Sequence, residues 1–357
     1  MMISYPSIEH FANLYKSVEY QTRYSKSEDG IAVYNEVPLP VITFIGTVKS
    51  HGSQGSIVYT RKSHNLVAQS RNRVLNLQHD NMEFCAYVMK HQKIFKQLLM
   101  TLSELREIVP YQVAIFGEWC GSGIQKGVAV SQLPKMFLPF AAKIIANGMH
   151  HWITARELSI DFINIGNEID YQLFKNLDSI RCFPIADFGI YPITIDFNDP
   201  KPAQEKINSW VQQIDQECPI GNRFGVSDHG EGLVFTATPP YSGGSLLQFK
   251  AKGSSHANVK SRSTNPTKIS NETYESIRNF VTDVLTESRL EQGIQYLQEM
   301  ELPIVMQSMG TFLSWINNDV IKEESQAIVD NDFNVKLVNK EISTVAREWF
   351  KNKVNAL

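Results

Sequence analysis

Apolar and polar positions alternate in short runs over the first two thirds of the chain, and most of these runs are rich in β-branched and aromatic residues. Such runs, bounded by glycine- or asparagine-containing turns, are typical of β-strands. The expected strands are residues 41–48, 56–60, 66–70, 111–116, 136–145, 185–195, 231–236 and 246–253. The run 185–195 fits either one strand or two.

Apolar residues at helical spacing predict a short helix over residues 7–17, with Ser7 as its N-cap, and one or two helices over 83–109. Another amphipathic helix is expected over 202–217. Residues 18–35 are polar and without a period, so we expect an exposed connection there. The remaining residues between 146 and 226 show no pattern from which function can be inferred, and they form a longer stretch than the motifs discussed below require.

The composition changes near residue 254. Residues 254–270 are polar and lightly basic with no apolar period, which is typical of a linker. Beyond them, helical stripes cover residues 274–285, 290–297, 312–321 and 342–350. The sequence therefore predicts an α+β domain over residues 1–253, a linker over 254–270 and an all-helical domain over 271–357.

Charge and cysteine content narrow the classes of function. The formal net charge of -3 offers no general attraction for a polyanion, so any nucleic-acid site must be a local basic patch. The four cysteines are widely spaced without a Cys-x-x-Cys pair, which argues against a disulfide framework and a structural zinc site. With no apolar run of about 18 residues and no signal-peptide pattern, we expect a cytoplasmic protein that does not enter a membrane.

A lysine at the end of an apolar strand is the most informative single position. Lys49 follows the run 41–48 and is itself followed by Ser50-His51-Gly52, a glycine turn. Desolvation or neighbouring cations at such a place lower the pKa of a lysine amine and make it a nucleophile. The alternative is that Lys49 simply extends from the strand end into solvent, and a K-x-x-G pattern arises readily by chance.

Other charged residues repeat this placement at apolar strand ends: Arg71, Glu118, Glu231, Lys250 and Lys252. Each also has a structural interpretation, since Arg71 could lie on a solvated edge, Glu118 could be a turn carboxylate, and the lysine pair could face solvent. Lys250 and Lys252 are two apart and so share one side of their strand. Together with Lys49 this set suits nucleotidyl transfer, which needs a nucleophile, cations for the phosphates and carboxylates for ribose and metal.

The order of these motifs resembles the covalent nucleotidyltransferases, the superfamily of DNA ligases, RNA ligases and mRNA-capping guanylyltransferases. The matching segments are Lys49-Ser50-His51-Gly52, Phe116-Gly117-Glu118, Glu231-Gly232-Leu233-Val234-Phe235 and Phe249-Lys250-Ala251-Lys252. A histidine two places after the lysine is similar to the RNA ligase 2 family, which includes phage nick-sealing and trypanosome RNA-editing enzymes. This resemblance covers residues 36–145 and 221–255, with a weaker match in the tail. It implies a nucleotidyltransferase fold of ATP-grasp-like antiparallel sheets with flanking helices.

The resemblance also implies roles for the residues of the first domain. Lys49 would carry AMP, His51 and Gly52 would complete its motif at the nucleotide, and Glu118 would hold the ribose. The remaining implied roles are adenine stacking for Phe140, metal binding for Glu231, phosphate binding for Lys250 and Lys252, and handling of the RNA 5'-phosphate for Arg71. Val48 and Ala141 depart from the phage-type pattern, which has acidic residues at both positions.

In the tail, Arg289, Asp319 and Glu323 fall where the phage-type helical domain has residues needed for RNA sealing. The function implied is that of a monomeric ATP-dependent RNA ligase with Mg²⁺ or Mn²⁺, joining RNA 3'-hydroxyl and 5'-phosphate ends, in nicked duplexes, during RNA repair. A DNA ligase is the nearest alternative, but His51 and a helical tail argue against it, and the tail also argues against a capping guanylyltransferase. A non-catalytic RNA-binding protein on a ligase fold is the third alternative.

Overall fold

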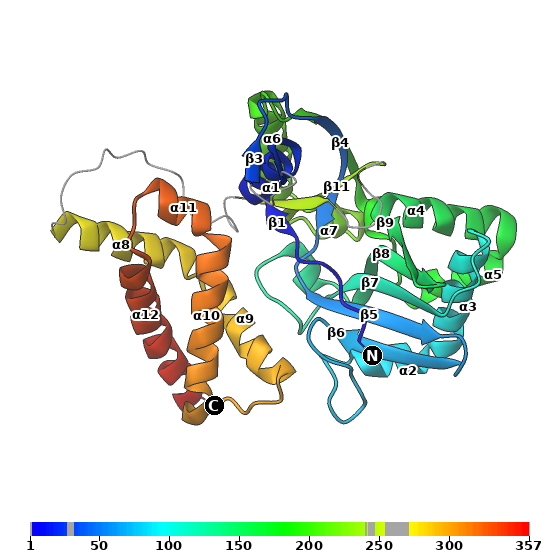
Figure 1. The fold of residues 1–357 in the computed structure, drawn as a ribbon. Helices are drawn as coiled ribbons and strands as arrows, with labels where there is room; N and C mark the ends of the chain where they lie inside the picture. The colour runs from blue at the N-terminus through cyan, green and yellow to red at the C-terminus, as the bar shows by residue number, and fades with distance from the viewer. Residues whose placement is uncertain (1, 27–31, 240, 242–246, 254–270, 357) are drawn as a thin grey trace. The chain divides into compact units, whose positions relative to one another are not determined.

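The computed structural model describes residues 2–26, 32–239, 241, 247–253 and 271–356. Contacts divide the chain into two compact units, Met1–Gly253 and Ser254–Leu357 (Figure 1). The linker expected over 254–270 lies outside the described residues. The first unit contains all the described strands, whereas the second contains helices only.

One five-stranded sheet of the first unit has the strand order β1-β12-β11-β4-β10. Its strands are β1 (Glu9–His10), β12 (Gln248–Lys252), β11 (Gly232–Ala237), β4 (Val41–Lys49) and β10 (Ile190–Asp196). The pairing of β1 with β12 is parallel, and the other pairings are antiparallel. This sheet, called the lysine sheet below, therefore brings the strands of three charged motifs side by side.

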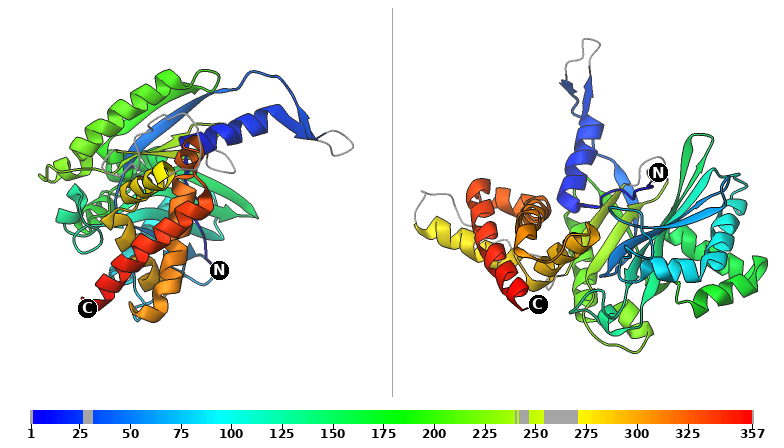
Figure 2. Two further views of the ribbon diagram at one scale, coloured as in Figure 1. Left: turned by 90° about the vertical axis from the view of Figure 1, so that its left-hand side faces the viewer. Right: turned by 90° about the horizontal axis from the view of Figure 1, so that it is seen from below.

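A second five-stranded sheet is antiparallel throughout, with the order β6-β5-β7-β8-β9. Its strands are β6 (Asn65–Ser70), β5 (Ser53–Thr60), β7 (Gln112–Cys120), β8 (Met136–Ala146) and β9 (Met149–Thr154). It is called the glutamate sheet below, since β7 carries Glu118. A small hairpin, β2 (Tyr24–Lys26) with β3 (Ala32–Tyr34), projects beyond the end of α1 (Figure 2).

Helices cover the outer face of each sheet. The helices α2 (Phe84–Lys90), α3 (Gln92–Glu104), α4 (Ala155–Asn164) and α5 (Tyr171–Ser179) pack on the glutamate sheet in one apolar core. The lysine sheet is covered by α1 (Phe11–Arg23) and α6 (Lys201–Gln216). A third apolar cluster joins the sheets, because it contains Val48 from β4 together with Cys120 and Leu138 from the glutamate sheet.

Four short elements complete the first unit. The element η1 (Ala129–Gln132) precedes β8, and η2 (Ile165–Ile169) and η3 (Ile185–Phe188) lie between α4 and β10. The helix α7 (Pro219–Arg223) lies between α6 and β11. The helix α4 begins with a capping box in which Thr154 and Glu157 satisfy each other's backbone N–H groups. The long stretch 146–226 thus completes the covering of both sheets and supplies the edge strand β10.

The second unit is an all-helical bundle. Its elements are α8 (Asn271–Val284), α9 (Glu287–Glu299), η4 (Met306–Ser308), α10 (Met309–Glu323), α11 (Ser325–Asp330) and α12 (Val335–Asn355). The predicted apolar stripes meet in one core, where Phe312 and Phe350 are fully buried with ring centroids 4.6 Å apart. The predicted fold class is confirmed: an α+β unit of antiparallel sheets with flanking helices, followed by an all-helical region.

Three local predictions near the N-terminus and around β7 were wrong. The first helix begins at Phe11 rather than Ser7, because Glu9 and His10 pair with β12 as a strand. It continues to Arg23, so residues 18–35 contain a helix end and a hairpin rather than an exposed connection. Glu118 lies inside β7, not in a glycine turn, because β7 pairs on both sides as far as Trp119.

Two further differences concern short helices. Neither α7 nor α11 was predicted. Both have five or six residues, too short to show an apolar period in the sequence. None of the helices in the described part of the chain has the length and hydropathy needed to cross a membrane.

Candidate active site

Three adjacent strands of the lysine sheet place two lysines on one rung. Gly232 of β11 pairs with Lys49 of β4 on one side and with Lys252 of β12 on the other. Because side chains on one rung project from the same face of a sheet, both ammonium groups extend from the same side. Gly232 has no side chain, so the space between the two lysines stays open.

Glycine is required at position 232 for two reasons. Its φ of +147° lies in the region that L-residues rarely adopt, and a Cβ there would lie 2.1 Å from the Ala251 carbonyl oxygen. The chain turns into β11 at this point, which directs the preceding side chain, Glu231, toward both lysines. A side chain at position 232 would therefore disturb the strand pairing and the site together.

Glu231 is the centre of an ion-pair cluster. Its Oε2 lies 2.7 Å from Lys49 Nζ and 3.3 Å from His51 Nδ1, and its Oε1 lies 3.6 Å from Lys252 Nζ. Only 4% of its side chain is exposed. Burial alone would raise the pKa of Glu231, but Lys49, the hydrogen bond from His51 and Lys252 together hold that pKa well below its ordinary value. Glu231 is therefore a carboxylate at neutral pH.

Glu118 faces the same cluster from the glutamate sheet. Burial raises its pKa from an ordinary 4.5 to about 7, and repulsion from Glu231 adds to this, while Lys49, a backbone hydrogen bond from Gly52 and Arg71 oppose it. Gly52 approaches β7 so closely that a Cβ would lie 2.4 Å from the Trp119 carbonyl oxygen. The short glycine turn after Lys49 thus places its backbone N–H against the Glu118 carboxyl group.

Replacing Glu118 with glutamine should change how stability depends on pH. Since the folded-state pKa is raised, Glu118 favours folding fully below about pH 4.5, and this contribution disappears as the pH rises through about 7. Glutamine does not titrate, so the free energy of unfolding of Glu118→Gln should rise relative to that of the wild type as the pH rises. We expect this difference to grow by on the order of 2 kcal/mol from about pH 5 to about pH 8. Urea denaturation of both proteins at the two pH values measures this. If the difference in free energy of unfolding between variant and wild type were the same at both pH values, the raised pKa would be contradicted.

Phe140, Arg71 and Lys250 complete the first unit's predicted set. The register of β8 against β7 shifts between Phe116 and Gly117, so that Phe140 has no ladder partner and lies at a bulge. Its half-buried ring packs against the apolar cluster between the sheets. Arg71 is exposed but close enough to Glu118 to lower its pKa. Lys250 lies two residues before Lys252 and pairs with Val234.

This arrangement can perform phosphoryl chemistry. A strand-end amine, a second ammonium on the same rung and two glutamates from different sheets meet at one place. A family model described as RNA ligase matches residues 42–252, which is more than half of the chain. The chain belongs to the RNA ligase family.

Solved structures of an RNA ligase from Naegleria gruberi are similar to this family member. A variant with AMP and Mn has 20% identity and a TM-score of 0.42. A second variant, with ATP and Mn, has 19% identity and a TM-score of 0.43, and the protein with PPi has 20% and 0.41. Each match covers 71% of this chain and 57% of the other, so the chain spans little more than half the length of these relatives. No curated protein matches it.

The family match thus confirms the predicted membership of the RNA ligase family. Membership of the RNA ligase 2 branch stays a prediction. All the matched residues lie in the first unit, which contains Lys49, His51, Glu118 and the other residues described above. The residues predicted for RNA sealing in the tail lie outside the match. For these tail residues, the structure describes only their contacts within the helical unit.

Arg289 is buried within the helical unit. Its Nε lies 3.1 Å from Asp319 Oδ2, its Nη2 lies 3.0 Å from Glu324 Oε1, and its Nη1 donates to the Val284 carbonyl oxygen. The structure thus joins Arg289 with Asp319, two of the three residues predicted for the tail, and Glu324 also contacts the guanidinium. The guanidinium thus links α9 to residues of the neighbouring helices. To contact an RNA phosphate, Arg289 would have to break at least one of these ion pairs or hydrogen bonds.

Sequence reasoning missed two residues that contact the predicted set. Glu324 was not among the predicted residues, although its buried side chain contacts Arg289. Tyr5 was overlooked because it precedes every recognised motif. Its ring packs 5.0 Å from that of Phe140, between segments 135 residues apart, and no local pattern signals such a contact.

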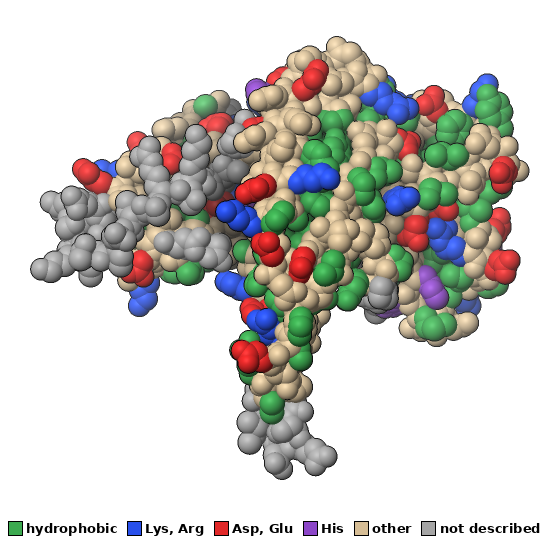
Figure 3. Space-filling model, turned by 90° about the horizontal axis from the view of Figure 1, so that it is seen from above, with side chains coloured by type: hydrophobic (Ala, Val, Ile, Leu, Met, Phe, Trp, Pro, Cys, Tyr) green, Lys and Arg blue, Asp and Glu red, His purple; other side chains and the backbone are tan. Residues whose placement is uncertain are grey.

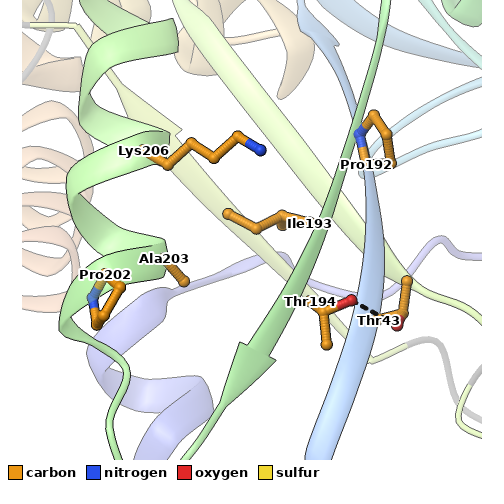
Figure 4. Close-up of a pocket in the computed structure, with 7 residues that line it drawn as sticks. All are labelled: Thr43, Pro192, Ile193, Thr194, Pro202, Ala203 and Lys206. Carbon is orange, nitrogen blue, oxygen red and sulfur yellow. Dashed lines mark hydrogen bonds between the residues drawn. The ribbon is translucent and has the colours of Figure 1, made fainter.

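A surface pocket of ≈ 420 Å³ lies elsewhere on the first unit, between β4, β10 and α6 (Figure 4). Lys206 extends from α6 over Ile193, and Thr43 bonds Thr194 across the strands. None of the described site residues lines it. On the face seen from above, the coloured Lys and Arg side chains are interspersed with Asp and Glu, in keeping with the net charge of -3 (Figure 3).

Proposed function

We propose that this family member is an ATP-dependent RNA ligase of the RNA ligase 2 type. In this proposal it joins an RNA 3'-hydroxyl to an RNA 5'-phosphate through a lysyl-AMP and an RNA-adenylate, as part of RNA repair. One observation carries it: Lys49 extends from the end of β4 beside Glu231, on the same rung as Lys252. The two lysines of this rung, on either side of Gly232, would supply a nucleophile and a fixed positive charge.

The proposed reaction has three balanced steps. The unprotonated Lys49 amine attacks the α-phosphorus of ATP, so that an N–P bond forms, the P–O bond to pyrophosphate breaks and the nitrogen loses a proton to solvent. An oxygen of the RNA 5'-phosphate then attacks the same phosphorus, and the lysine leaves and regains a proton. In the last step the 3'-hydroxyl attacks the RNA 5'-phosphorus, loses its proton and releases AMP. Lys250 and Lys252 would stabilise the charge on the phosphates.

The resting ion pair sets a condition on the first step. Glu231 at 2.7 Å favours the protonated form of Lys49, which is not a nucleophile. The sequence suggested that neighbouring cations favour the unprotonated amine of Lys49. Because Glu231 opposes this effect, those cations alone do not determine the protonation state of Lys49. The amine becomes free when Glu231 turns to another partner.

A divalent cation fits this role of partner. The described residues contain no group of three or more metal-ligating side chains. Mg²⁺ commonly binds one or two carboxylates and takes its other ligands from water and substrate phosphates, and the ionised Glu231 can supply such a carboxylate. When bound, Mg²⁺ or Mn²⁺ would neutralise phosphate charge. Glu231 would hold it, and Glu118, whose pKa of about 7 lets it donate or accept a proton, would hydrogen-bond the ribose.

The two units would divide the work. Residues 1–253 would form the adenylyltransferase domain, with Phe140 stacking on adenine and Arg71 contacting the RNA 5'-phosphate. Residues 271–357 would bind the RNA, since the protein's net charge provides no general attraction for a polyanion. The proposed partner is a nicked RNA duplex, and the proposed form is a cytoplasmic monomer.

Labelling and sealing assays test this function. With ATP labelled at the α-phosphate we expect an acid-stable protein label, with none from matched GTP, and sealing of a nicked duplex whose 3'-hydroxyl strand is RNA. A GTP label would indicate a capping guanylyltransferase, and equal sealing of RNA and DNA 3'-hydroxyl strands would indicate a DNA ligase. RNA binding without any nucleotide label would indicate a non-catalytic binding protein.

A further inference from the structure

The N-terminal segment crosses from one sheet of the first unit to the other. At its start, the Ile3 backbone N–H donates to Gln69 of β6, at 3.3 Å, in the glutamate sheet. At its end, His10 pairs with Lys250 in the lysine sheet. Figure 1 shows the dark blue chain running from the glutamate sheet up to β1. Residues 3–10 thus bridge the two layers that contribute the candidate active site.

Tyr5 lies midway along this bridge with its ring against the glutamate sheet. The ring centroid is 5.3 Å from that of Phe116, 5.0 Å from Phe140 and 5.6 Å from Trp152. The contact with Phe140 is edge-on, at 67°, a favourable geometry for two aromatic rings. Because Phe140 lies at a bulge without a ladder partner, packing by neighbours such as Tyr5 determines where its ring points.

The hydroxyl group of Tyr5 reaches the other sheet. It donates to Gln248 Oε1 at 2.8 Å, and Gln248 Nε2 donates in turn to Thr236 Oγ1 at 2.8 Å. Burial raises the pKa of Tyr5 above its ordinary value, against the lowering effect of this hydrogen bond, so the phenol stays a donor at neutral pH. Gln248 lies on the same face of β12 as Lys250, two residues on. One side chain therefore touches the ring proposed for adenine and the strand proposed for phosphates.

A second tie lies two residues further along the bridge. Arg71 Nη2 donates to Ser7 Oγ at 3.3 Å. The bridge thus contacts the surroundings of Phe140, Arg71 and Lys250, which belong to three different strands or strand ends.

We propose that Tyr5 is a positioning residue for nucleotide binding: anchored through Gln248, its ring holds the Phe140 ring in the orientation that receives the base. This inference rests on the proposed function, because it takes ATP as the substrate of the first unit. Tyr5 itself need not touch the nucleotide. Its effect should be felt in binding of the base rather than in binding of the phosphates.

Two probes separate these effects, AMP for the base-containing part and inorganic pyrophosphate for the phosphate part. We expect Tyr5→Ala and Tyr5→Leu to weaken AMP binding about tenfold, the scale of losing a well-formed aromatic contact, with pyrophosphate binding unchanged. The KM for ATP in lysyl-AMP formation should rise in parallel while kcat stays within about threefold. Tyr5→Phe, which keeps the ring but loses the hydrogen bond to Gln248, should weaken AMP binding by less than Tyr5→Ala does.

A double-mutant cycle with Phe140→Ala gives the deciding readout. If Tyr5 acts through Phe140, Tyr5→Ala should cause no further loss of AMP binding in the Phe140→Ala background. Additive losses would overturn the inference, as would equal weakening of AMP and pyrophosphate, which indicates general loosening. Tyr111→Ala, at a tyrosine that is 57% exposed, is the matched control and should bind both probes normally.

The two proposals fail in different ways. If the wild type neither binds AMP nor takes up label from ATP, the proposed function is wrong and the role of Tyr5 falls with it. If the wild type does both and the Tyr5 variants match it, only the positioning role is wrong. Thermal unfolding of each variant shows that the chain is folded, and Tyr5→Leu keeps apolar contact if Tyr5→Ala unfolds.

Discussion

A Lys49→Ala variant is expected to take up no label from ATP. The amine of Lys49 is the proposed nucleophile at the end of β4, and alanine leaves no nitrogen there to attack the α-phosphorus. The measurement is incubation with ATP labelled at the α-phosphate, followed by acid and a denaturing gel. Loss of the label should be complete, because Lys49 is the one side chain that carries the nucleotide in the proposed reaction.

The fold should survive this substitution, because Glu231 keeps two of its three positively charged or hydrogen-bonding neighbours, His51 and Lys252. Lys206→Ala is the matched control, since Lys206 is an exposed lysine of the same unit that lies in the separate surface pocket. It should label as the wild type does. Label that persists on Lys49→Ala would show that the covalent nucleotide, if any, is carried elsewhere.

Neutralising Lys252 or Lys250 should slow lysyl-AMP formation by on the order of a hundredfold or more. Removing one fixed charge that contacts the transition state typically has an effect of this size. Lys252 lies on the Lys49 rung, and Lys250 lies one alternate position along the same face of β12. The measurement is the single-turnover rate constant at subsaturating ATP for Lys252→Ala and for Lys250→Ala.

Lys252→Ala also removes one of the charges that keep the pKa of Glu231 low, so part of its effect would come through that carboxylate. Lys250→Ala tests the other lysine of the pair, which lies opposite Val234 and away from the Gly232 rung. Lys62→Ala, at an exposed lysine in the turn after β5, is the control for loss of one positive charge. Unchanged rates for both β12 variants would show that this lysine pair is only a charged strand face.

Much of the site was predictable because its signals are local. A β-branched run ending in Lys49 predicts a strand end, and β4 ends at that residue. Lys250 and Lys252 share a face because β12 is a regular strand, as alternation requires. The pairing of Gly232 with both lysines was not predictable, since it depends on β4 pairing with β11, which lies far from it in the chain.

The errors have physical causes that act over long range. The prediction ended the strand before Gly117 because glycine commonly marks a turn, yet β7 continues, since Gly117 gives room to the Phe137 ring on the neighbouring strand. The helix start at Ser7 looked favourable locally, but backbone pairing with β12 fixes Glu9 and His10 as a strand. The raised pKa of Glu118 likewise depends on burial and on Glu231, which no sequence pattern around position 118 reveals.

The two-residue strand β1 has a consequence for solubility. Without it, β12 would be the edge of its sheet, with unpaired N–H and C=O groups along the strand that contains Lys250 and Lys252. Exposed edges of this kind allow strands from other molecules to pair, which leads to aggregation. Proteolysis ahead of α1, or a tag that displaces Glu9 and His10, would therefore remove an edge cap and leave this strand open to intermolecular pairing.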